Sequence, residues 1–282
     1  MLTVVGVLVV VVVVGGATTF AWMIDDTRFG RPSEEFDAVA AQIEDLPGVS
    51  SVESDRWVEA PFVDAPSSSI AVTVDEGGLP GVLDAACSTD YPGNIQWSLR
   101  VHTATATLVS VHEKSDEPED GGGGSPCPSF GFDAVGLVEE IDRVVPGLAI
   151  QSSIWEDGML TLVALGEESA VSEASLASLL PLVAHSGELL AGAGMGPTAH
   201  LEINASTLGL IVEPGEEDAY VALLTRLAED HDVRNFWADG SGTPEDGIER
   251  VQIVAPEGQR TMIEQLVRAS GLHIAEFPIK FV

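Results

Sequence analysis

The feature that most limits the fold is an uncharged apolar segment at the N-terminus, Leu2 to Ile24. Val and Leu dominate its first half, and the apolar run continues through Trp22 until Asp25 interrupts it. A helix that crosses a bilayer needs about 20 consecutive apolar residues, and a Trp near one end is typical of the membrane–water interface. The segment therefore predicts a transmembrane anchor over residues 1–24, followed by a water-soluble body.

A cleaved signal peptide is the alternative for the same segment. The Val-rich run has the length of a signal-peptide core, and Thr19-Phe20-Ala21 loosely matches a small-x-small cleavage motif. The apolar run continues past that motif, which favours an uncleaved anchor. The segment contains no cysteine, which excludes a lipidated cysteine there.

The flanks of the segment leave the direction of insertion open. Arg28 and Arg31 follow it closely, and the positive-inside rule would place them, and the body with them, in the cytoplasm. An N-terminal apolar segment followed by a long domain is more typical of export, and Lys and Arg are scarce throughout the chain. We therefore expect a single-pass protein of the cell membrane whose body lies outside the cytoplasm. A cytoplasm-facing membrane regulator is the alternative.

The body is strongly acidic. The 282 residues include 45 Asp and Glu against 12 Lys and Arg, a formal net charge of −33, while 45% hydrophobic residues suffice for packed cores. Such a surface repels phosphate groups, and DNA or RNA binding normally needs a basic patch, which the sequence lacks. Nucleic acid is therefore excluded as a partner. A surface kept soluble by like charge is the simplest interpretation, and cations or basic proteins are compatible with it.

Two cysteines, Cys87 and Cys127, are the site residues that the sequence predicts. Neither has a second Cys or a His at metal-ligand spacing beside it, which argues against a redox CxxC motif and against a zinc site. Outside the cytoplasm the two thiols can form one disulfide. Two unpaired buried thiols are the alternative.

A short motif recurs on both sides of a Gly- and Pro-rich segment. Residues 116–129 contain four consecutive glycines among acids and prolines, which predicts a linker. Phe36-Asp37-Ala38-Val39 recurs unchanged at residues 132–135. Each copy opens a helical pattern that ends at Pro-Gly and leads into a strand-like run with a Trp, and a fainter third copy begins at Asp218. The recurring Trp side chains, which we expect to fill cores, are Trp57, Trp155 and Trp237.

The order of apolar runs in the third copy predicts its topology. Between Thr207 and Phe281 the patterns follow the order β-α-β-β-α-β, with residues 273–281 as the closing strand. This is the order of ferredoxin-like folds, a name that describes topology alone. The first copy lacks a recognisable opening strand, because the apolar segment occupies that place. We therefore predict an α+β fold in which an N-terminal transmembrane helix is followed by about three small ferredoxin-like modules. The predicted borders are 1–24 for the anchor, 33–115 for module 1, 116–129 for the linker, 130–206 for module 2 and 207–282 for module 3.

No catalytic signature is recognisable. None of the six histidines forms an HExxH motif or another close pair, and His102 and His112 share a sheet face only if no turn intervenes. A G-x-S-x-G motif is absent, and the glycine-rich residues 192–196 lack the Lys-Ser/Thr of a phosphate-binding loop. The acids of residues 116–120 lack EF-hand spacing. We therefore predict no enzyme, no catalytic or cofactor-binding residue, no metal ligand and no cofactor.

Neighbouring carboxylates are frequent simply because the chain is acidic. A glycosidase needs two carboxylates across a cleft, and one sequence does not distinguish such a pair from surface charge. Glu34-Glu35 and Glu216-Glu217 lie where helices are expected to begin, and the helix dipole favours acids there.

The helix–Pro-Gly-Val–strand unit, with Pro47-Gly48-Val49 at its turn, resembles the small modules repeated in bacterial envelope proteins such as BON domains. The resemblance covers a short part of each copy and carries over no site residues. Together with the predicted anchor, it favours a membrane-anchored, non-catalytic envelope protein whose repeated acidic modules contact other proteins or the cell-wall layer. A small-ligand binding protein or hydrolase with a site between modules is the alternative, and a cleft with converging carboxylates or histidines would favour it.

Overall fold

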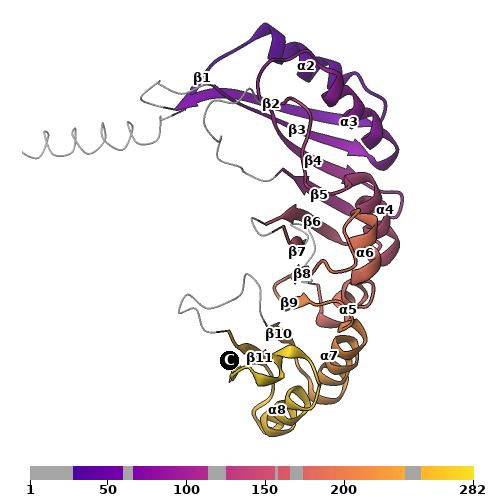
Figure 1. Cartoon of the computed structure of the whole chain (residues 1–282), viewed down its shortest axis with the longest axis vertical. Coiled ribbons are helices and arrows are strands. Elements are labelled where there is room, and N and C mark those ends of the chain that lie inside the picture. The colour runs from indigo at the N-terminus through magenta and orange to yellow at the C-terminus, as the bar shows by residue number, and fades with distance from the viewer. Residues whose placement is uncertain (1–27, 60–65, 114–124, 156–157, 166–173, 239–248) are drawn as a thin grey trace, which may run out of the picture.

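The computed structural model describes residues 28–59, 66–113, 125–155, 158–165, 174–238 and 249–282. One β-sheet runs through these segments, and its twelve strands stand side by side in the order of the sequence (Figure 1). The strands are β1 (Arg28–Gly30), β2 (Val49–Glu59), β3 (Ser67–Asp75), β4 (Gln96–His102), β5 (Leu108–His112), β6 (Ala149–Ile154), β7 (Leu160–Leu165), β8 (Leu201–Asn204), β9 (Leu208–Val212), β10 (Asn235–Ala238), β11 (Val251–Val254) and β12 (Ile279–Phe281). The helices are α2 (Glu34–Glu44), α3 (Leu79–Ser88), α4 (Ala134–Val144), α5 (Leu176–Ala184), α6 (Ser186–Gly192), α7 (Glu217–His231) and α8 (Arg260–Arg268), with short 3-10 helices η1 (Glu76–Gly78), η3 (Glu257–Gln259) and η4 (His273–Glu276).

Two kinds of connection alternate along the sheet. Hairpins join β2 to β3, β4 to β5, β6 to β7, β8 to β9 and β10 to β11 in antiparallel pairs. Helical crossovers join β3 to β4, β5 to β6, β7 to β8, β9 to β10 and β11 to β12 in parallel pairs. One hairpin and the helix after it form a ββα unit, and every unit extends the sheet in the same direction. The strands therefore line the inner side of a crescent, and the described helices lie along its outer side (Figure 1).

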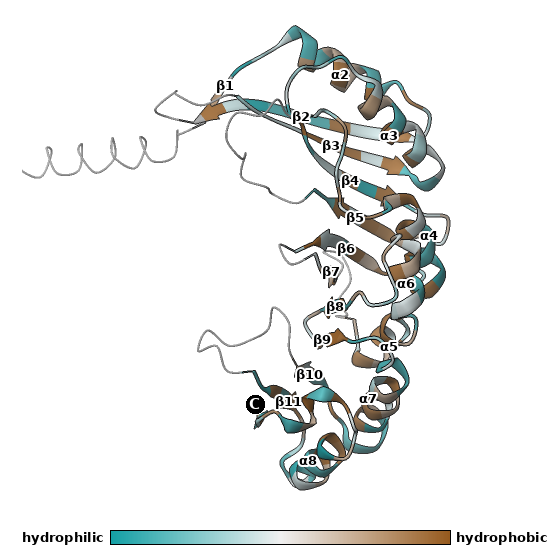
Figure 2. Ribbon diagram, in the orientation of Figure 1, coloured by the Kyte–Doolittle hydropathy of each residue, from teal (hydrophilic) through white to brown (hydrophobic). Residues whose placement is uncertain are grey.

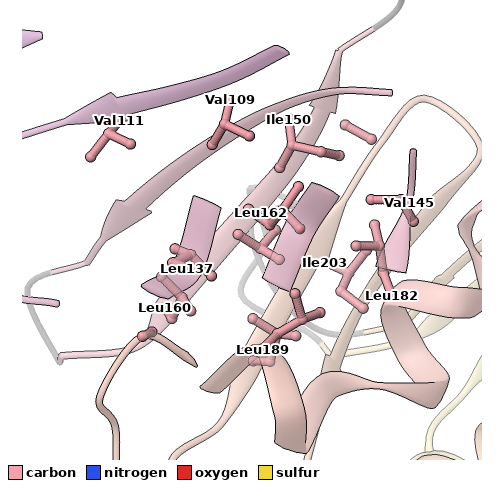
Figure 3. Packing of buried hydrophobic residues seen from close by; sticks show 14 of the residues in the cluster. Val109, Val111, Leu137, Val145, Ile150, Leu160, Leu162, Leu182, Leu189 and Ile203 are labelled. Atoms are coloured by element: carbon pink, nitrogen blue, oxygen red, sulfur yellow. The ribbon is translucent and has the colours of Figure 1, made fainter. Parts of the chain in front are cut away.

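The helix-covered face of the sheet carries one continuous core. Figure 2 shows mostly hydrophobic residues along the middle strands. Along the helices it shows both hydrophobic and hydrophilic residues, as expected for helices that are buried on one side. One buried residue from each strand β3 to β11 lies in register with the next, forming the row Val72, Leu99, Val111, Ser152, Leu162, Ile203, Leu210, Ala238 and Val251. Leu137 of α4, Leu182 of α5 and Leu189 of α6 pack against its centre (Figure 3). The core continues across residues 206 and 207, where one module border was predicted, and the domain borders themselves stay a prediction.

The predicted fold class, three ferredoxin-like modules behind a transmembrane helix, is wrong in its arrangement of strands. The six elements expected between Thr207 and Phe281 are present in the predicted order, as β9, α7, β10, β11, α8 and β12. In a ferredoxin-like module the second β-α-β unit turns back and interleaves with the first. Here β10 pairs with β9 and β11, and β12 continues outward from β11. The result is an α/β fold with one growing sheet.

The pairing order also sets the hand of the crossovers. Successive parallel pairs point in opposite directions, because one hairpin separates them. Since the five crossovers step the same way and keep their helices on one face, successive crossovers have opposite hand. About 98% of β-α-β crossovers are right-handed. In a ferredoxin-like module both crossovers are right-handed, because the second β-α-β unit runs back towards the first. The same sequence pattern serves both arrangements, and the general preference favours the closed module.

The predicted transmembrane helix also has to be corrected. None of the helices in the described ranges is long and apolar enough to cross a bilayer. Residues 1–24, to which the predicted membrane span, signal anchor and single-pass topology referred, lie outside the described residues. The described chain is thus an α/β body, and its first element is β1, an opening strand that the sequence did not predict and that pairs antiparallel with β2.

The repeated motif is shifted relative to its helices by about one turn. Helices α2 and α4 begin at residues 34 and 134, whereas the motif begins at residues 36 and 132. Phe36 therefore lies inside α2 and is buried, while Phe132 precedes α4. The Pro-Gly turns are equivalent, because Gly48 and Gly147 both adopt a positive φ before the next strand, a conformation that glycine adopts without strain. The recurrence therefore marks a repeated helix–turn–strand unit.

Candidate functional site

The face of the sheet opposite the helices carries a second in-register row of side chains. Strand alternation puts every second residue there, and one residue from each strand β2 to β12 lies level with its neighbours. The row, which we call the open-face row, is Ser51, Thr73, Arg100, Ser110, Gln151, Val163, Asn204, Gly209, Trp237, Gln252 and Lys280. With strands about 4.8 Å apart, its ten steps span about 48 Å.

The open-face row differs in charge from the rest of the chain. It contains no acid, although the chain has 45 Asp and Glu, and it holds two of the 12 Lys and Arg, Arg100 and Lys280. Both of these side chains are exposed, and most of the others in the row are partly exposed. Hydroxyl and amide groups make up most of the rest, so the row offers donors and acceptors for hydrogen bonds along its length.

The recurring Trp side chains lie on this open face and do not fill the core. Trp57 is level with Ser67, which alternates with the buried Ser68. Trp155 follows β6 with 49% of its surface exposed, and its backbone N–H donates to the carbonyl of Met159 across the hairpin. Trp237 belongs to the open-face row, and the strand position of Phe236 beside it faces the core. The strands β2, β6 and β10 run in the same direction, so every fourth strand carries a Trp on this face.

Trp237 is seated on the sheet through its neighbour in register. Its indole N–H donates to the carbonyl of Ala205 at 3.4 Å. A Cβ at Gly209, the residue beside it on β9, would lie 2.7 Å from the Cδ1 atom of the indole. The indole of Trp237 can therefore lie against the backbone of β9 only because residue 209 is a glycine.

Two histidines of the open face do not form a metal site. His102 is level with Leu108, whereas His112 is level with Ser98, so the two imidazoles lie at opposite ends of the β4–β5 hairpin. The Nδ1 atom of His112 is 3.1 Å from the Ser98 hydroxyl. Burial lowers the pKa of His112, and the nearby positive charge of Arg100 acts in the same direction.

Polar groups at the centre of the open face are buried. Glu202 on β8 is level with Thr161 on β7, and the Thr161 hydroxyl donates to the Glu202 carboxylate at 2.8 Å. Only 2% of Glu202 and 1% of Thr161 is exposed. The exposed carboxylates Glu53 and Asp55 lie on the same strand, β2. A glycosidase needs two carboxylates that face each other across a cleft, and these two do not.

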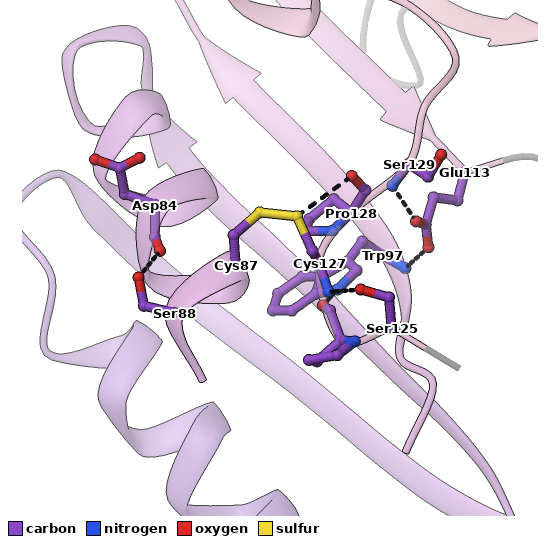
Figure 4. The surroundings of a disulfide bond; sticks show 10 residues. Asp84, Cys87, Ser88, Trp97, Glu113, Ser125, Cys127, Pro128 and Ser129 are labelled. Atoms are coloured by element: carbon purple, nitrogen blue, oxygen red, sulfur yellow. Dashed lines mark hydrogen bonds between the residues drawn. A yellow bond between two sulfur atoms is a disulfide. The ribbon is translucent and has the colours of Figure 1, made fainter. Parts of the chain in front are cut away.

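Cys87 and Cys127 are joined by a disulfide (Figure 4). It ties the end of α3 to the segment that leads to α4; the first part of the predicted linker, up to residue 124, lies outside the described residues. Beside it, the indole of the buried Trp97 donates to the carbonyl of Pro126 at 2.7 Å. This Trp, and not the recurring ones, is the core Trp of the body.

The carboxylate of Glu113 holds the same segment from the other side. It accepts hydrogen bonds from the backbone N–H of Trp97, at 2.8 Å, and from that of Ser129 (Figure 4). Burial raises the pKa of Glu113, and these two hydrogen bonds oppose the rise. The disulfide and Glu113 together fix residues 125–129 onto the sheet.

Two neighbouring acids meet a histidine from a distant part of the chain where β9 ends. Glu213 follows β9, Glu216 is the N-cap residue of α7, and His273 begins η4. Each offers one atom that can ligate a metal, and these atoms lie within 4.8 Å of one another. In the sequence analysis Glu216 was interpreted as an acid favoured by the helix dipole, and His273 was assigned to a predicted strand.

No protein-family model, no curated protein and no solved structure matches the chain. The resemblance of its short helix–turn–strand unit to BON domains stays a prediction.

Proposed function

We propose that the chain is a non-catalytic binding protein that holds a polysaccharide of the cell-wall layer along the open-face row. The single observation that carries this proposal is the register of the row: eleven strands each contribute one residue to a line of about 48 Å. A long polymer needs such a line, whereas a small substrate needs a pocket.

The chemistry of the row supports a sugar polymer as the partner. Sugars are recognised by hydrogen bonds from hydroxyl and amide groups together with aromatic rings against which their apolar faces pack. The row supplies Gln, Asn, Ser and Thr, and the recurring Trp side chains lie on the same face. The absence of acids from the row avoids burying unpaired carboxylates beneath a neutral chain.

A protein partner is the weaker candidate. Stable protein interfaces concentrate their energy in a central cluster of large buried side chains. The large exposed hydrophobic residues of the described chain are scattered along it and form no single cluster in sequence: Phe29, Trp155, Leu165, Met262 and Val282. The centre of the open-face row, from Ser110 to Gly209, holds no aromatic residue and no Leu, Ile or Met.

The disulfide supports a location outside the cytoplasm. Disulfides persist in oxidising compartments and are rare in the cytosol, and Cys87–Cys127 joins two consecutive ββα units. The proposal therefore places the body on the outer side of the cell, where the cell-wall layer is accessible. We keep two predictions from the sequence analysis in this proposal. The chain is expected not to be an enzyme, and it is expected to bind no nucleic acid.

Binding to insoluble polysaccharides tests the proposal. The purified chain is mixed with chitin, cellulose or peptidoglycan, and the fraction removed from solution is measured against polysaccharide concentration. We expect Trp155→Ala to weaken binding about two- to twelvefold, because one aromatic contact contributes about 0.5–1.5 kcal/mol. Met262→Ala is the matched control, because Met262 is similarly exposed, at 47%, but lies on α8.

Three outcomes separate the alternatives. Weaker binding by Trp155→Ala together with wild-type binding by Met262→Ala supports the open face as the site. No binding to any of the three polysaccharides overturns the proposal. Equal binding by the wild type and both variants overturns the assignment to the open face, because the polymer would then contact another surface.

A further inference from the structure

The side chains around His273 bring potential metal-ligating atoms of three residues close together. The Nδ1 atom of His273 is 2.8 Å from one carboxylate oxygen of Glu216, and the backbone N–H of His273 donates to the other at 3.0 Å. Two ligand atoms of one tetrahedral zinc ion lie about 3.4 Å apart, so Glu216 and His273 need to separate only slightly from their hydrogen-bonded positions to share an ion. The Glu213 carboxylate adds a third ligand within 4.8 Å.

The imidazole is held in place by two aromatic rings. The ring of Tyr220 lies 6.3 Å from that of His273, and the ring of Phe277 lies 5.9 Å from it, both edge to face. Only 27% of the His273 side chain and 18% of the Glu216 side chain is exposed. A ligand whose ring is already oriented loses little conformational freedom when it binds an ion.

The donor set indicates which ion fits. One imidazole nitrogen and two carboxylates are ordinary ligands of zinc, with a fourth position for water. Calcium needs six to eight oxygen ligands, which an imidazole does not supply. A histidine binds a metal through its neutral imidazole, so the two carboxylates would give the ligand set a negative charge that a divalent cation balances.

We propose that Glu213, Glu216 and His273 bind one zinc ion that clasps the C-terminal end of the sheet. Glu216 and His273 are 57 residues apart in the chain, and between them lie α7, β10, β11 and α8. In a repeat protein each unit contacts only its neighbours, so the last unit is held from one side alone. A metal bridge from the end of β9 to η4 closes the last two units into one loop. This proposal is independent of the polysaccharide.

Zinc titration of the whole chain tests the clasp. Zn²⁺ is titrated into the chain in a calorimeter, in a buffer whose excess Mg²⁺ occupies scattered surface carboxylates. We expect one Zn²⁺ per chain, and we expect His273→Ala to weaken its binding at least tenfold. His185→Ala is the matched control, because the Nδ1 atom of His185 also lies close to a carboxylate, 2.7 Å from Glu188, but on the exposed junction of α5 and α6.

A second variant and a second readout keep folding defects apart from lost ligands. Glu213→Gln preserves the shape of its side chain and removes one ligand charge, and it is also expected to lower the affinity at least tenfold. Zn²⁺ at a concentration that saturates the wild type is expected to raise its melting temperature by about 5 °C, reversibly with EDTA, and to raise that of Glu213→Gln clearly less. Absence of stoichiometric zinc from the wild type, or wild-type affinity in Glu213→Gln and His273→Ala, overturns the proposal.

Discussion

Removing the disulfide is expected to destabilise the chain by about 4 kcal/mol. Cys87 and Cys127 are separated by 40 residues, and a cross-link that closes a loop of this length restricts the unfolded chain by about 4 kcal/mol at 25 °C. Cys87 is exposed and Cys127 partly exposed. Cys87→Ala/Cys127→Ala therefore opens no cavity in the core, and nearly all of its effect comes from the lost cross-link.

Urea unfolding at equilibrium measures this loss. The unfolding midpoint of the double variant is compared with that of the oxidised wild type, and the free energies are extrapolated to water. Trp97 reports on the same region by fluorescence, because its indole donates to Pro126 next to the disulfide. The wild type in reducing agent is the control and should unfold with the double variant. A loss below about 1 kcal/mol would refute the reasoning, since the reduced unfolded chain would then already hold the two ends together.

Two further predictions concern the open face. His112→Gln is expected to reduce the acid sensitivity of folding: because the pKa of His112 is lowered in the folded state, its contribution is present above about pH 6.5 and is lost as the pH falls through the folded pKa. Urea midpoints at about pH 7.5 and 5.5 should therefore differ less in the variant than in the wild type, and equal differences would contradict the prediction. Gly209→Ala is expected to cost about 1–3 kcal/mol, because its Cβ would lie 2.7 Å from the indole of Trp237. Gly196→Ala is the control in the same urea assay, since its Cβ would meet no atom within 4 Å, and equal losses in both variants would show that the close approach is unimportant.

Local structure was predictable wherever one residue sufficed to signal it. Ser33 precedes α2, and its hydroxyl accepts from the backbone N–H of Phe36 at 3.4 Å, as expected for a capping serine. Glu216 stands at the start of α7, where acids are favoured. Apolar runs located the strands β9, β10 and β11 of the third copy. All these signals act within a few residues of the chain.

The pairing of strands was not predictable, because it depends on where each crossover turns. The order β-α-β-β-α-β and the burial of one sheet face are common to a closed ferredoxin-like module and to this open sheet. Helices of successive units pack against each other, as α5 does against α7, and no short motif in the sequence records that packing.

The candidate sites were missed for two different reasons. At the end of β10, Phe236, Trp237 and Ala238 are all apolar, so alternation does not reveal which of them faces the core. Phe236 and Ala238 are buried in the core, and Trp237 lies on the open face. His273 was assigned to a strand, whereas residues 273–276 form a 3-10 helix whose first side chain meets a carboxylate 57 residues away.

The way the sheet ends explains why the open face has a defined length. The outermost described strands, β1 and β12, have three residues each, and short edge strands discourage pairing with another chain. Between them each ββα unit adds two strands, or about 10 Å of open face. A polymer laid across the strands would gain a similar set of contacts from every unit, so its affinity would rise with the number of units in contact. Such a protein needs no deep pocket and no catalytic cluster, and its ends, where units have one neighbour, are where cross-links contribute most to stability.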